Sequence, residues 1–281
     1  MTELKLNVEC FNLKYTLECG QCFRWQKVDN SYIGVINDRV IKTRLEDGNL
    51  YVKSNNMDNI ENILCDYFDL NVDYKKTEQH ISTIDEYVKK AVNNTTGIRI
   101  LNQSFFEILI SYIISANNNI PRISKSVLEI SKKYGSKVTF EEKPYYLFPT
   151  VEQLSDVSQI QFRECGVGFR DKYIKKTIDD ILSKNIKFEE FKNMPTLQIR
   201  EELLKLQGVG PKVADCILLF SCGRKEVFPI DVWVEKIMRK LYFTDDNITK
   251  KEIVKHAYEK FGVNAGIVQQ HLFYNIRENM L

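Results

Sequence analysis

The segment 203–231, which reads LLKLQGVGPKVADCILLFSCGRKEVFPID, constrains the fold of this chain more than any other part. It places a Gly-Val-Gly turn between two apolar runs with helical spacing, and Gly208 and Gly210 give that turn a backbone freedom that other residues lack. Pro211 suits the first position of a helix, where its missing N–H is not needed, and Gly223 is a typical helix stop. The segment therefore predicts two helices joined by a tight hairpin.

The first helix is expected over Thr196–Leu206, with three leucines on its buried side: Leu203, Leu204 and Leu206. The backbone N–H groups around Gly208 and Gly210 lie next to the start of the second helix. N–H groups at a helix N-terminus bind anions, and a DNA phosphate fits such a site. A turn between two helices that binds nothing is the alternative that the hairpin alone leaves open.

Two ionisable side chains accompany the hairpin. Lys212 lies just inside the second helix and shares one face with Cys216, four residues later. Asp231 ends the segment and precedes another run with helical spacing, Val232–Leu241. A lysine amine can form a Schiff base once burial favours its neutral form, and a carboxylate can stabilise positive charge or assist proton transfer. A helix N-cap is the other possible role of Asp231, and the two roles are compatible.

Composition and charge set broad limits. The 281 residues suggest one or two domains with a sizeable core, and 43% hydrophobic with 28% charged residues is the composition of a globular protein. The net charge of +2 permits nucleic-acid binding without indicating it, so a local basic face would have to make the contact. We expect no membrane span, because no apolar run is long enough.

The cysteines and histidines indicate neither a metal nor a cofactor. The seven cysteines and the absence of a signal peptide favour free thiols in a reducing cytoplasm. Cys19 and Cys22 form a lone CxxC pair, with no second pair at ligand spacing. We interpret His80, His256 and His271 as incidental, because none has a recognisable catalytic spacing.

The first 80 residues are expected to form strands and turns, and the chain from about 82 onward to form helices. Tyr32–Ile36, Val40–Leu45 and Asn49–Lys53 are β-prone, and Glu46-Asp47-Gly48 is a hairpin signal between the last two. The expected fold class is α+β: a small antiparallel sheet domain at 1–80 and a mainly helical domain at 81–281.

Three Ser/Thr-x-x-Glu sequences are typical of capping boxes, in which side chains satisfy the free N–H groups of a helix start. They begin at Ser104, Thr139 and Thr249. We therefore expect a helix to start at each, the first being the apolar helix that runs up to Ala116.

Five segments together resemble, in the same order, the 8-oxoguanine DNA glycosylases of the helix-hairpin-helix-GPD superfamily. They are Gly20–Trp25 (GQCFRW), Ile98–Asn119 followed by Arg122, Gly166–Arg170 with Tyr173, the hairpin with Lys212, Cys216 and Asp231, and Ala265–Phe273. The resemblance covers nearly the whole chain. It implies an N-terminal TBP-like antiparallel sheet domain, followed by two helical lobes with the DNA cleft between them. The cysteines that hold the iron–sulfur cluster of the endonuclease III branch are absent after Cys222.

The resemblance implies a base-excision repair enzyme that removes 8-oxoguanine, opposite cytosine, and cleaves the strand as a DNA lyase. In that superfamily a lysine after the hairpin marks the bifunctional enzymes and the distal aspartate is catalytic, which assigns these roles to Lys212 and Asp231. A base inside a duplex has to be flipped out before its sugar can be attacked. The partner would be double-stranded DNA containing 8-oxoguanine. We expect a monomer in the cytoplasm, associated with the nucleoid if the source is bacterial.

The resemblance also assigns a base pocket. Phe273 and Cys216 would sandwich the flipped purine, and Gln269, one turn before Phe273, would meet its Watson–Crick edge. The carbonyl of Gly20 would accept the imidazole-ring N–H that 8-oxoguanine has and guanine lacks. An unmatched buried acceptor costs on the order of 1–3 kcal/mol, so this contact would discriminate. Each of the four residues, taken singly, fits a core or surface role as well.

Further residues resemble those that contact the DNA around the flipped nucleotide. Asn117, Arg122 and Arg170 would fill the vacated stack and read the orphaned cytosine, and Phe169 would be the aromatic wedge beside it. A phosphate contact or a surface ion pair is the other possibility for the arginines. Trp233 stands where several family members have a histidine associated with a phosphate contact, and indole keeps one N–H donor but loses the ionisable ring.

Two other functions are weighed against this one. A related glycosylase for oxidised pyrimidines or mismatched adenine is disfavoured by the missing cluster cysteines, by Lys212 and by the Gln269 and Phe273 pair. A non-catalytic DNA-binding module that shares only the hairpin should lack the lysine and the aspartate together, and this chain has both.

Overall fold

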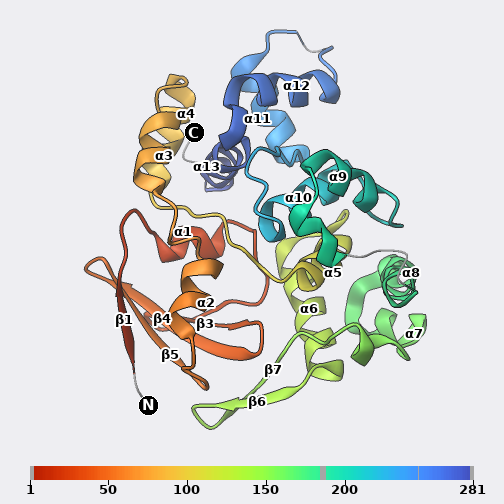
Figure 1. The fold of residues 1–281 in the computed structure, drawn as a ribbon. Coiled ribbons are helices and arrows are strands. Elements are labelled where there is room, and N and C mark those ends of the chain that lie inside the picture. Colours follow the sequence, from red (N-terminus) through yellow and green to blue (C-terminus); the bar gives the residue numbers. More distant parts are fainter. Residues whose placement is uncertain (1–2, 184–187, 246, 279–281) are drawn as a thin grey trace.

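The computed structural model describes residues 3–183, 188–245 and 247–278. A five-stranded antiparallel sheet forms one side of the molecule, and most of the helices form the other (Figure 1). The strands follow the order β1-β5-β4-β3-β2. Their bounds are β1 Leu4–Asn7, β2 Gln26–Val28, β3 Ser31–Ile36, β4 Arg39–Glu46 and β5 Asn49–Ser54. This arrangement confirms the α+β class, and the three β-prone runs are β3, β4 and β5.

The turn between β4 and β5 is the one that the sequence predicts. Asp47 and Gly48 have φ values of 48° and 72°, the left-handed conformation that a tight hairpin requires. The turn sets the register, so that Leu45 lies opposite Leu50. Leu50 and Val52 are then fully buried on the same face of the sheet.

The described residues 3–81 also contain three helices, so the expectation of strands and turns alone was wrong. These are α1 Leu13–Glu18, α2 Ile60–Tyr67 and α3 Tyr74–Ile81. The physical reason is burial. α2 covers the apolar face of the sheet with Ile60 and Leu64, whereas Tyr74 and Ile81 of α3 join the core of the helical part. Such long-range packing overrides the weak local preference of short segments.

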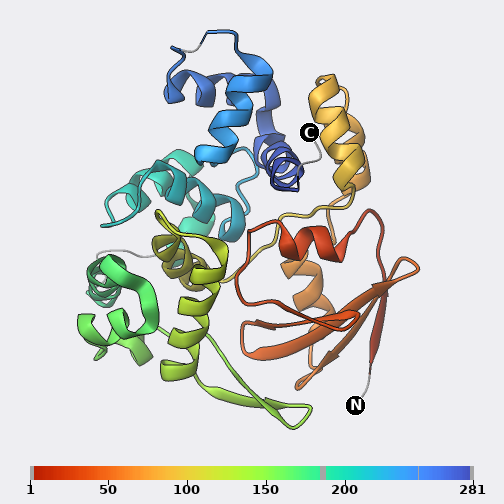
Figure 2. The same cartoon turned by 180° about the vertical axis from the view of Figure 1, so that it is seen from behind.

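The helical part follows with α4 Glu86–Thr95, α5 Phe105–Ser115, α6 Ile120–Tyr134, α7 Gln159–Phe162, α8 Asp171–Leu182, α9 Thr196–Leu204, α10 Pro211–Ser221, α11 Val232–Tyr242, α12 Lys250–Phe261 and α13 Ala265–Arg277. Short 3-10 or π turns cover Glu152–Leu154, Arg163–Val167, Gly168–Arg170, Phe188–Asn193 and Gly262–Asn264. α5 packs against α10, and α13 packs against both α4 and α11 (Figures 1 and 2). No helix among the described residues is long and apolar enough to cross a bilayer.

The helix expected to start at Thr139 is absent. Residues there form a hairpin of β6, Lys137–Phe140, and β7, Lys143–Tyr146, which reaches from α6 to β4 of the sheet (Figure 2). Phe140 is buried against Ile33 and Val40 of the sheet. Burial of this ring on a strand outweighs the local capping pattern.

The other two capping patterns differ from each other. Thr249 forms the predicted capping box with Glu252 at the start of α12. α5 does begin after Ser104, but the Ser104 side chain makes no capping bond. Glu107 instead pairs with Arg24 at 3.0 Å, which joins the GQCFRW segment to α5. A buried arginine is a stronger partner for this carboxylate than an exposed N–H group.

Candidate active site

The predicted hairpin is present between α9 and α10. Gly208 has a φ of 84°, and a Cβ there would lie 2.8 Å from the Tyr173 ring, so the turn requires glycine at this position. Gly210 is the N-cap of α10 and has open space around it, which leaves the start of the helix accessible to a phosphate. Leu203 and Leu206 are buried as expected, whereas Leu204, the last residue of α9, is 37% exposed.

Lys212, Cys216 and Asp231 lie in one neighbourhood. Lys212 is the second residue of α10, and its Nζ lies 5.0 Å from the centre of the Tyr112 ring. Burial raises the pKa of the Cys216 thiol to about 11, while the charge of Lys212 lowers it and that of Asp231 raises it. Both charges are thus close enough to act on the same thiol. The buried Cys216 is consequently a neutral surface for packing and no nucleophile at neutral pH.

Asp231 is the N-cap of α11. Its Oδ1 accepts a hydrogen bond of 2.8 Å from the N–H of Val234. The capping role is therefore confirmed, and it holds the carboxylate at a fixed place beside α10. The preceding Ile230 is buried, which anchors the loop that delivers Asp231 to the site.

Gly20 and Phe273 come together from opposite ends of the chain. Gly20 has a φ of 88°, and a Cβ there would lie 3.5 Å from Phe273 and 3.2 Å from Ile120. A side chain would be both strained and crowded. The Gly20 carbonyl accepts a hydrogen bond of 3.4 Å from the Tyr112 hydroxyl. Tyr112 thus connects the neighbourhood of Lys212 with that of Gly20.

Buried hydrogen bonds fix the backbone next to Gly20. The Gln21 Nε2 group donates to the carbonyls of Thr16 and Arg99, each at 2.8 Å, and Gln21 Oε1 accepts from the N–H of Leu101 at 2.9 Å. Gln21 is fully buried. This side chain therefore holds the turn at Gly20 against the segment that leads into α5, which gives the GQCFRW sequence a physical role.

The recognition residues predicted on α13 lie on one face of that helix. Gln269 is only 4% exposed, and its Oε1 accepts from the side chain of Gln270 at 2.7 Å. Phe273 is half-buried, one turn further on and beside Gly20. The structure therefore brings Gly20 and Cys216 close to Tyr112 and places Phe273 beside Gly20, with Gln269 one turn earlier on α13.

A second group of predicted residues surrounds the end of α5. Arg170 is buried and donates from Nε to the Ala116 carbonyl at 2.8 Å and from Nη2 to the Asn117 carbonyl at 2.9 Å. Its guanidinium carbon lies 4.4 Å from the centre of the Phe169 ring, which is 52% exposed. Burial, and then the charge of nearby Arg122, lowers the pKa of Arg170. Arg170 thus shapes the loop that presents the exposed Asn117.

Trp233 lies two residues beyond Asp231 and is 59% exposed. The Nζ of Lys236 lies 5.3 Å from the ring centre. The position that has a histidine in several family members thus keeps a positive charge beside it, supplied by a lysine.

Tyr112 is not among the site residues predicted from the sequence. It lies inside the apolar run ILISYII of α5, where an aromatic residue is expected to be core. The signal that could have revealed it is the hydroxyl, because a buried tyrosine normally finds a partner for its O–H.

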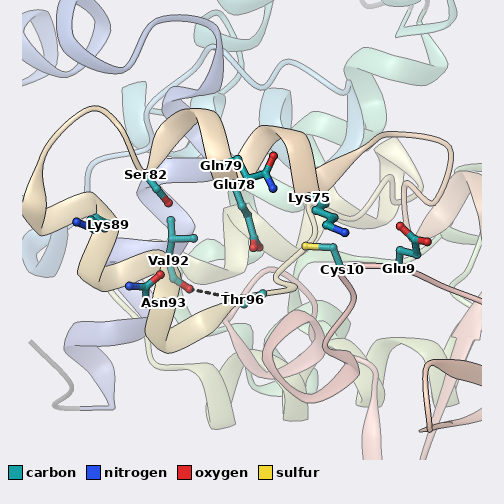
Figure 3. Close-up of a pocket in the computed structure, with 10 residues that line it drawn as sticks. All are labelled: Glu9, Cys10, Lys75, Glu78, Gln79, Ser82, Lys89, Val92, Asn93 and Thr96. Carbon is teal, nitrogen blue, oxygen red and sulfur yellow. Dashed lines mark hydrogen bonds between the residues drawn. The ribbon is translucent and has the colours of Figure 1, made fainter.

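A cavity of about 670 Å³ lies between α3 and α4 (Figure 3). Its lining includes Cys10, Lys75 and Glu78 and none of the predicted site residues. Figure 3 shows the Glu78 and Cys10 side chains pointing toward each other. This cavity is therefore separate from the predicted site around Lys212.

His271, which has no catalytic spacing in the sequence, is fully buried on α13. Its Nδ1 lies 2.7 Å from the Thr95 hydroxyl of α4, and its Nε2 lies 3.8 Å from Glu78 Oε1. Burial lowers the pKa of His271 to about 3. Asn275, one turn later, donates to the Ala91 carbonyl at 2.9 Å. These bonds attach α13 to α4.

Comparisons with known proteins agree with this geometry. Residues 3–109 match the 8-oxoguanine DNA glycosylase N-terminal domain, and residues 110–262 match the HhH-GPD superfamily of base excision DNA repair proteins. The probable N-glycosylase/DNA lyase of Methanothermobacter thermautotrophicus is 30% identical over 99% of this chain and 97% of its own. An N-glycosylase/DNA lyase of Arabidopsis thaliana is 30% identical over 96% of this chain and 78% of its own.

A solved structure shares the whole fold. The Clostridium acetobutylicum 8-oxoguanine glycosylase/lyase, in complex with double-stranded DNA containing cytosine opposite 8-oxoguanine, has a TM-score of 0.92 and 43% identity. The match covers 96% of this chain and 93% of that one. The chain therefore belongs to the 8-oxoguanine DNA glycosylase/lyase family of the HhH-GPD superfamily, base excision repair enzymes that are both N-glycosylases and DNA lyases.

Proposed function

We propose that this protein excises 8-oxoguanine opposite cytosine from duplex DNA, with Lys212 as the nucleophile, and then cleaves the strand at the abasic site. The observation that carries the proposal is the grouping of Lys212, Cys216 and Asp231 next to Gly20 and Phe273. A nucleophile and a base pocket are thereby within one neighbourhood. The opposite cytosine is the base present in the DNA of the Clostridium acetobutylicum complex.

Lys212 would carry the covalent chemistry. Its neutral amine attacks C1′ of the flipped nucleotide, the bond from C1′ to the base breaks, and the base leaves with a proton. The sugar ring opens and a Schiff base joins Nζ to C1′. Loss of a proton from C2′ then expels the 3′ phosphate, which cleaves the strand by β-elimination.

Asp231 would act on the charge that this sequence creates. Positive charge develops on the sugar as the base departs, and a carboxylate at a fixed position stabilises it without having to reorganise. The hydrogen bond from Val234 supplies that fixed position. The cap and the catalytic role therefore use the same side chain for compatible purposes.

The base pocket would recognise the lesion by one carbonyl and by stacking. Gly20 would accept the imidazole-ring N–H of 8-oxoguanine, with Phe273 and the neutral Cys216 thiol on the two faces of the base. Gln269 would meet the Watson–Crick edge, for which its amide has both donors and an acceptor. Gln269 is only 4% exposed, and the hydrogen bond from Gln270 holds its amide in place on α13.

The remaining contacts would hold the duplex. Arg122 and Arg170 would read the orphaned cytosine, with Asn117 in the vacated stack and Phe169 beside it. Phosphates would lie against the turn N–H groups around Gly208 and Gly210 and against Trp233. We propose a monomer that acts in the cytoplasm, on nucleoid DNA if the source is bacterial.

A panel of four duplexes tests this function. They hold 8-oxoguanine opposite cytosine, 8-oxoguanine opposite adenine, thymine glycol, and an adenine mismatch. We expect cleavage of the first, slower cleavage of the second, and none of the others. Cleavage of thymine glycol or of the adenine mismatch at a rate equal to that of 8-oxoguanine would refute the substrate, while a resistant 8-oxoguanine duplex would refute the function as a whole.

A further inference from the structure

We propose that Tyr112 is a positioning and specificity residue that connects the nucleophile to the base pocket. Its ring holds the Lys212 side chain, and its hydroxyl holds the Gly20 carbonyl. One rigid side chain thereby sets where the amine lies relative to the acceptor that recognises the lesion. This inference rests on the proposed function, since it gives a role to the pocket at Gly20.

The ring of Tyr112 is fixed from two sides. It stacks on Phe220 of α10 with ring centres 5.7 Å apart, and it meets the edge of Phe23 at 5.5 Å. Phe23 belongs to the same GQCFRW segment as Gly20, and Phe220 to the same helix as Lys212. Tyr112 is 3% exposed. Its position is therefore determined by the two elements that it connects.

Lys212 uses the face of this ring. Its Nζ lies 5.0 Å from the ring centre, within the range of a cation–π contact. A lysine side chain has four rotatable bonds. Each bond that the ring contact already fixes reduces the conformational entropy lost when the reacting geometry forms. The aromatic ring, and not the hydroxyl, supplies this contact.

Gly20 uses the other end of Tyr112. The hydroxyl donates to its carbonyl over a long distance of 3.4 Å. A carbonyl oxygen has two lone pairs, so Gly20 can accept from Tyr112 and from a base N–H at the same time. Burial raises the pKa of Tyr112 well above its ordinary value, so the hydroxyl keeps its proton and remains a donor.

Two variants separate these roles. Tyr112→Phe keeps the ring and removes the hydroxyl, whereas Tyr112→Leu removes both. We measure single-turnover cleavage of two duplexes, one with 8-oxoguanine and one with a preformed abasic site, each opposite cytosine. The abasic duplex needs Lys212 but presents no base to Gly20. Tyr67→Phe is the control, because its hydroxyl is buried within the sheet domain, where it accepts from Trp25 at 2.8 Å.

The variants should change the cleavage rates of the two duplexes to different extents. Tyr112→Phe should cleave the abasic duplex within about twofold of wild type and lose about fivefold on 8-oxoguanine, the size of one neutral hydrogen bond. Tyr112→Leu should lose about tenfold on both, by analogy with a mispositioned reacting group. Tyr67→Phe should leave the ratio of the two rates unchanged.

Other results overturn the inference. Equal losses of Tyr112→Phe on both duplexes, or none on either, would refute the hydroxyl role. Abasic cleavage by Tyr112→Leu at the wild-type rate would refute the ring role. A wild-type protein that cleaves the abasic duplex but not the 8-oxoguanine duplex would instead refute the proposed substrate and, with it, the hydroxyl role.

Discussion

The two halves of the site are built in different ways. Lys212 and Asp231 both lie at helix starts, on α10 and α11, which are neighbours in the chain. The proposed base pocket is assembled from Gly20 near the N-terminus, Cys216 on α10, and Phe273 near the C-terminus. The proposed chemistry thus lies in one short segment, whereas the proposed recognition depends on packing across the whole molecule. Changes at the first should abolish the reaction, and changes at the second should alter which substrates react.

The difference between the two halves of the site is tested most severely at Lys212. We expect Lys212→Gln to abolish covalent trapping by borohydride on 8-oxoguanine DNA, because glutamine keeps length and polarity but has no amine. Damaged-DNA binding should survive. The measurement is the yield of the covalent complex on a denaturing gel, with Lys205→Gln, an exposed lysine on the other side of the turn, as the control. Undiminished trapping by Lys212→Gln would place the nucleophile elsewhere.

Asp231→Asn should have the next largest effect. Asparagine is as good an N-cap as aspartate, so the bond to Val234 is retained while the charge is lost. Single-turnover excision should fall by ~10²–10³, the range typical of a lost electrostatic stabiliser, with little change in DNA affinity. A rate within about threefold of wild type would reduce Asp231 to its capping role.

Gly20→Ala should affect recognition more than chemistry. The new methyl group would lie 3.2 Å from Ile120, on a backbone with φ of 88°. We expect 8-oxoguanine excision to fall about 10- to 100-fold, because the recognising carbonyl shifts, while abasic-site cleavage changes by only a few fold. Gly262→Ala serves as the control, because Gly262 also has a positive φ, 54°, but has open space around it. Equal losses on both substrates would contradict the separation of the two halves.

The same difference explains what the sequence could predict. The hairpin, Lys212 and the Asp231 cap follow from local rules of turns and caps, and three strands follow from alternation and a turn signal. Tyr112 and His271 were missed because their roles depend on partners far away in the chain, Gly20 and Thr95. The β6–β7 hairpin was missed for the same reason, since burial of Phe140 against the sheet decides it.

Arg122 and Arg170 give a smaller test within the recognition half. Arg122 is exposed, whereas Arg170 is buried and tied to the Ala116 and Asn117 carbonyls. Arg122→Ala should reduce the differences in affinity among the four opposite bases by about tenfold or less, without loss of stability. Arg170→Ala should flatten the ranking and also lower the melting temperature, because two loop carbonyls lose their donor. A variant that weakens binding equally for all four opposite bases, and whose salt slope falls by about one, would indicate a phosphate contact instead.

The smallest expected effect on activity lies at His271, which is buried on α13. Its pKa of about 3 in the folded protein is below the ordinary value of 6.5, so the unfolded chain takes up the proton first as the pH falls. The stability that the neutral ring contributes is therefore complete above pH 6.5 and is lost between about 6.5 and about 3, at no more than about 1.4 kcal/mol per pH unit. Burial raises the pKa of nearby Glu78, which acts in the opposite direction because the folded protein binds that proton first.

Comparison with His271→Gln cancels the Glu78 contribution and isolates the histidine, since glutamine can still donate to Thr95. Urea unfolding from pH 8 to pH 4.5 should show a constant difference in the free energy of unfolding down to about 6.5, and below that a wild-type protein that loses stability faster than the variant. A difference that stays constant to pH 4.5 would mean that His271 is protonated in the folded protein as readily as in the unfolded chain, and that the attachment of α13 to α4 does not depend on a neutral ring.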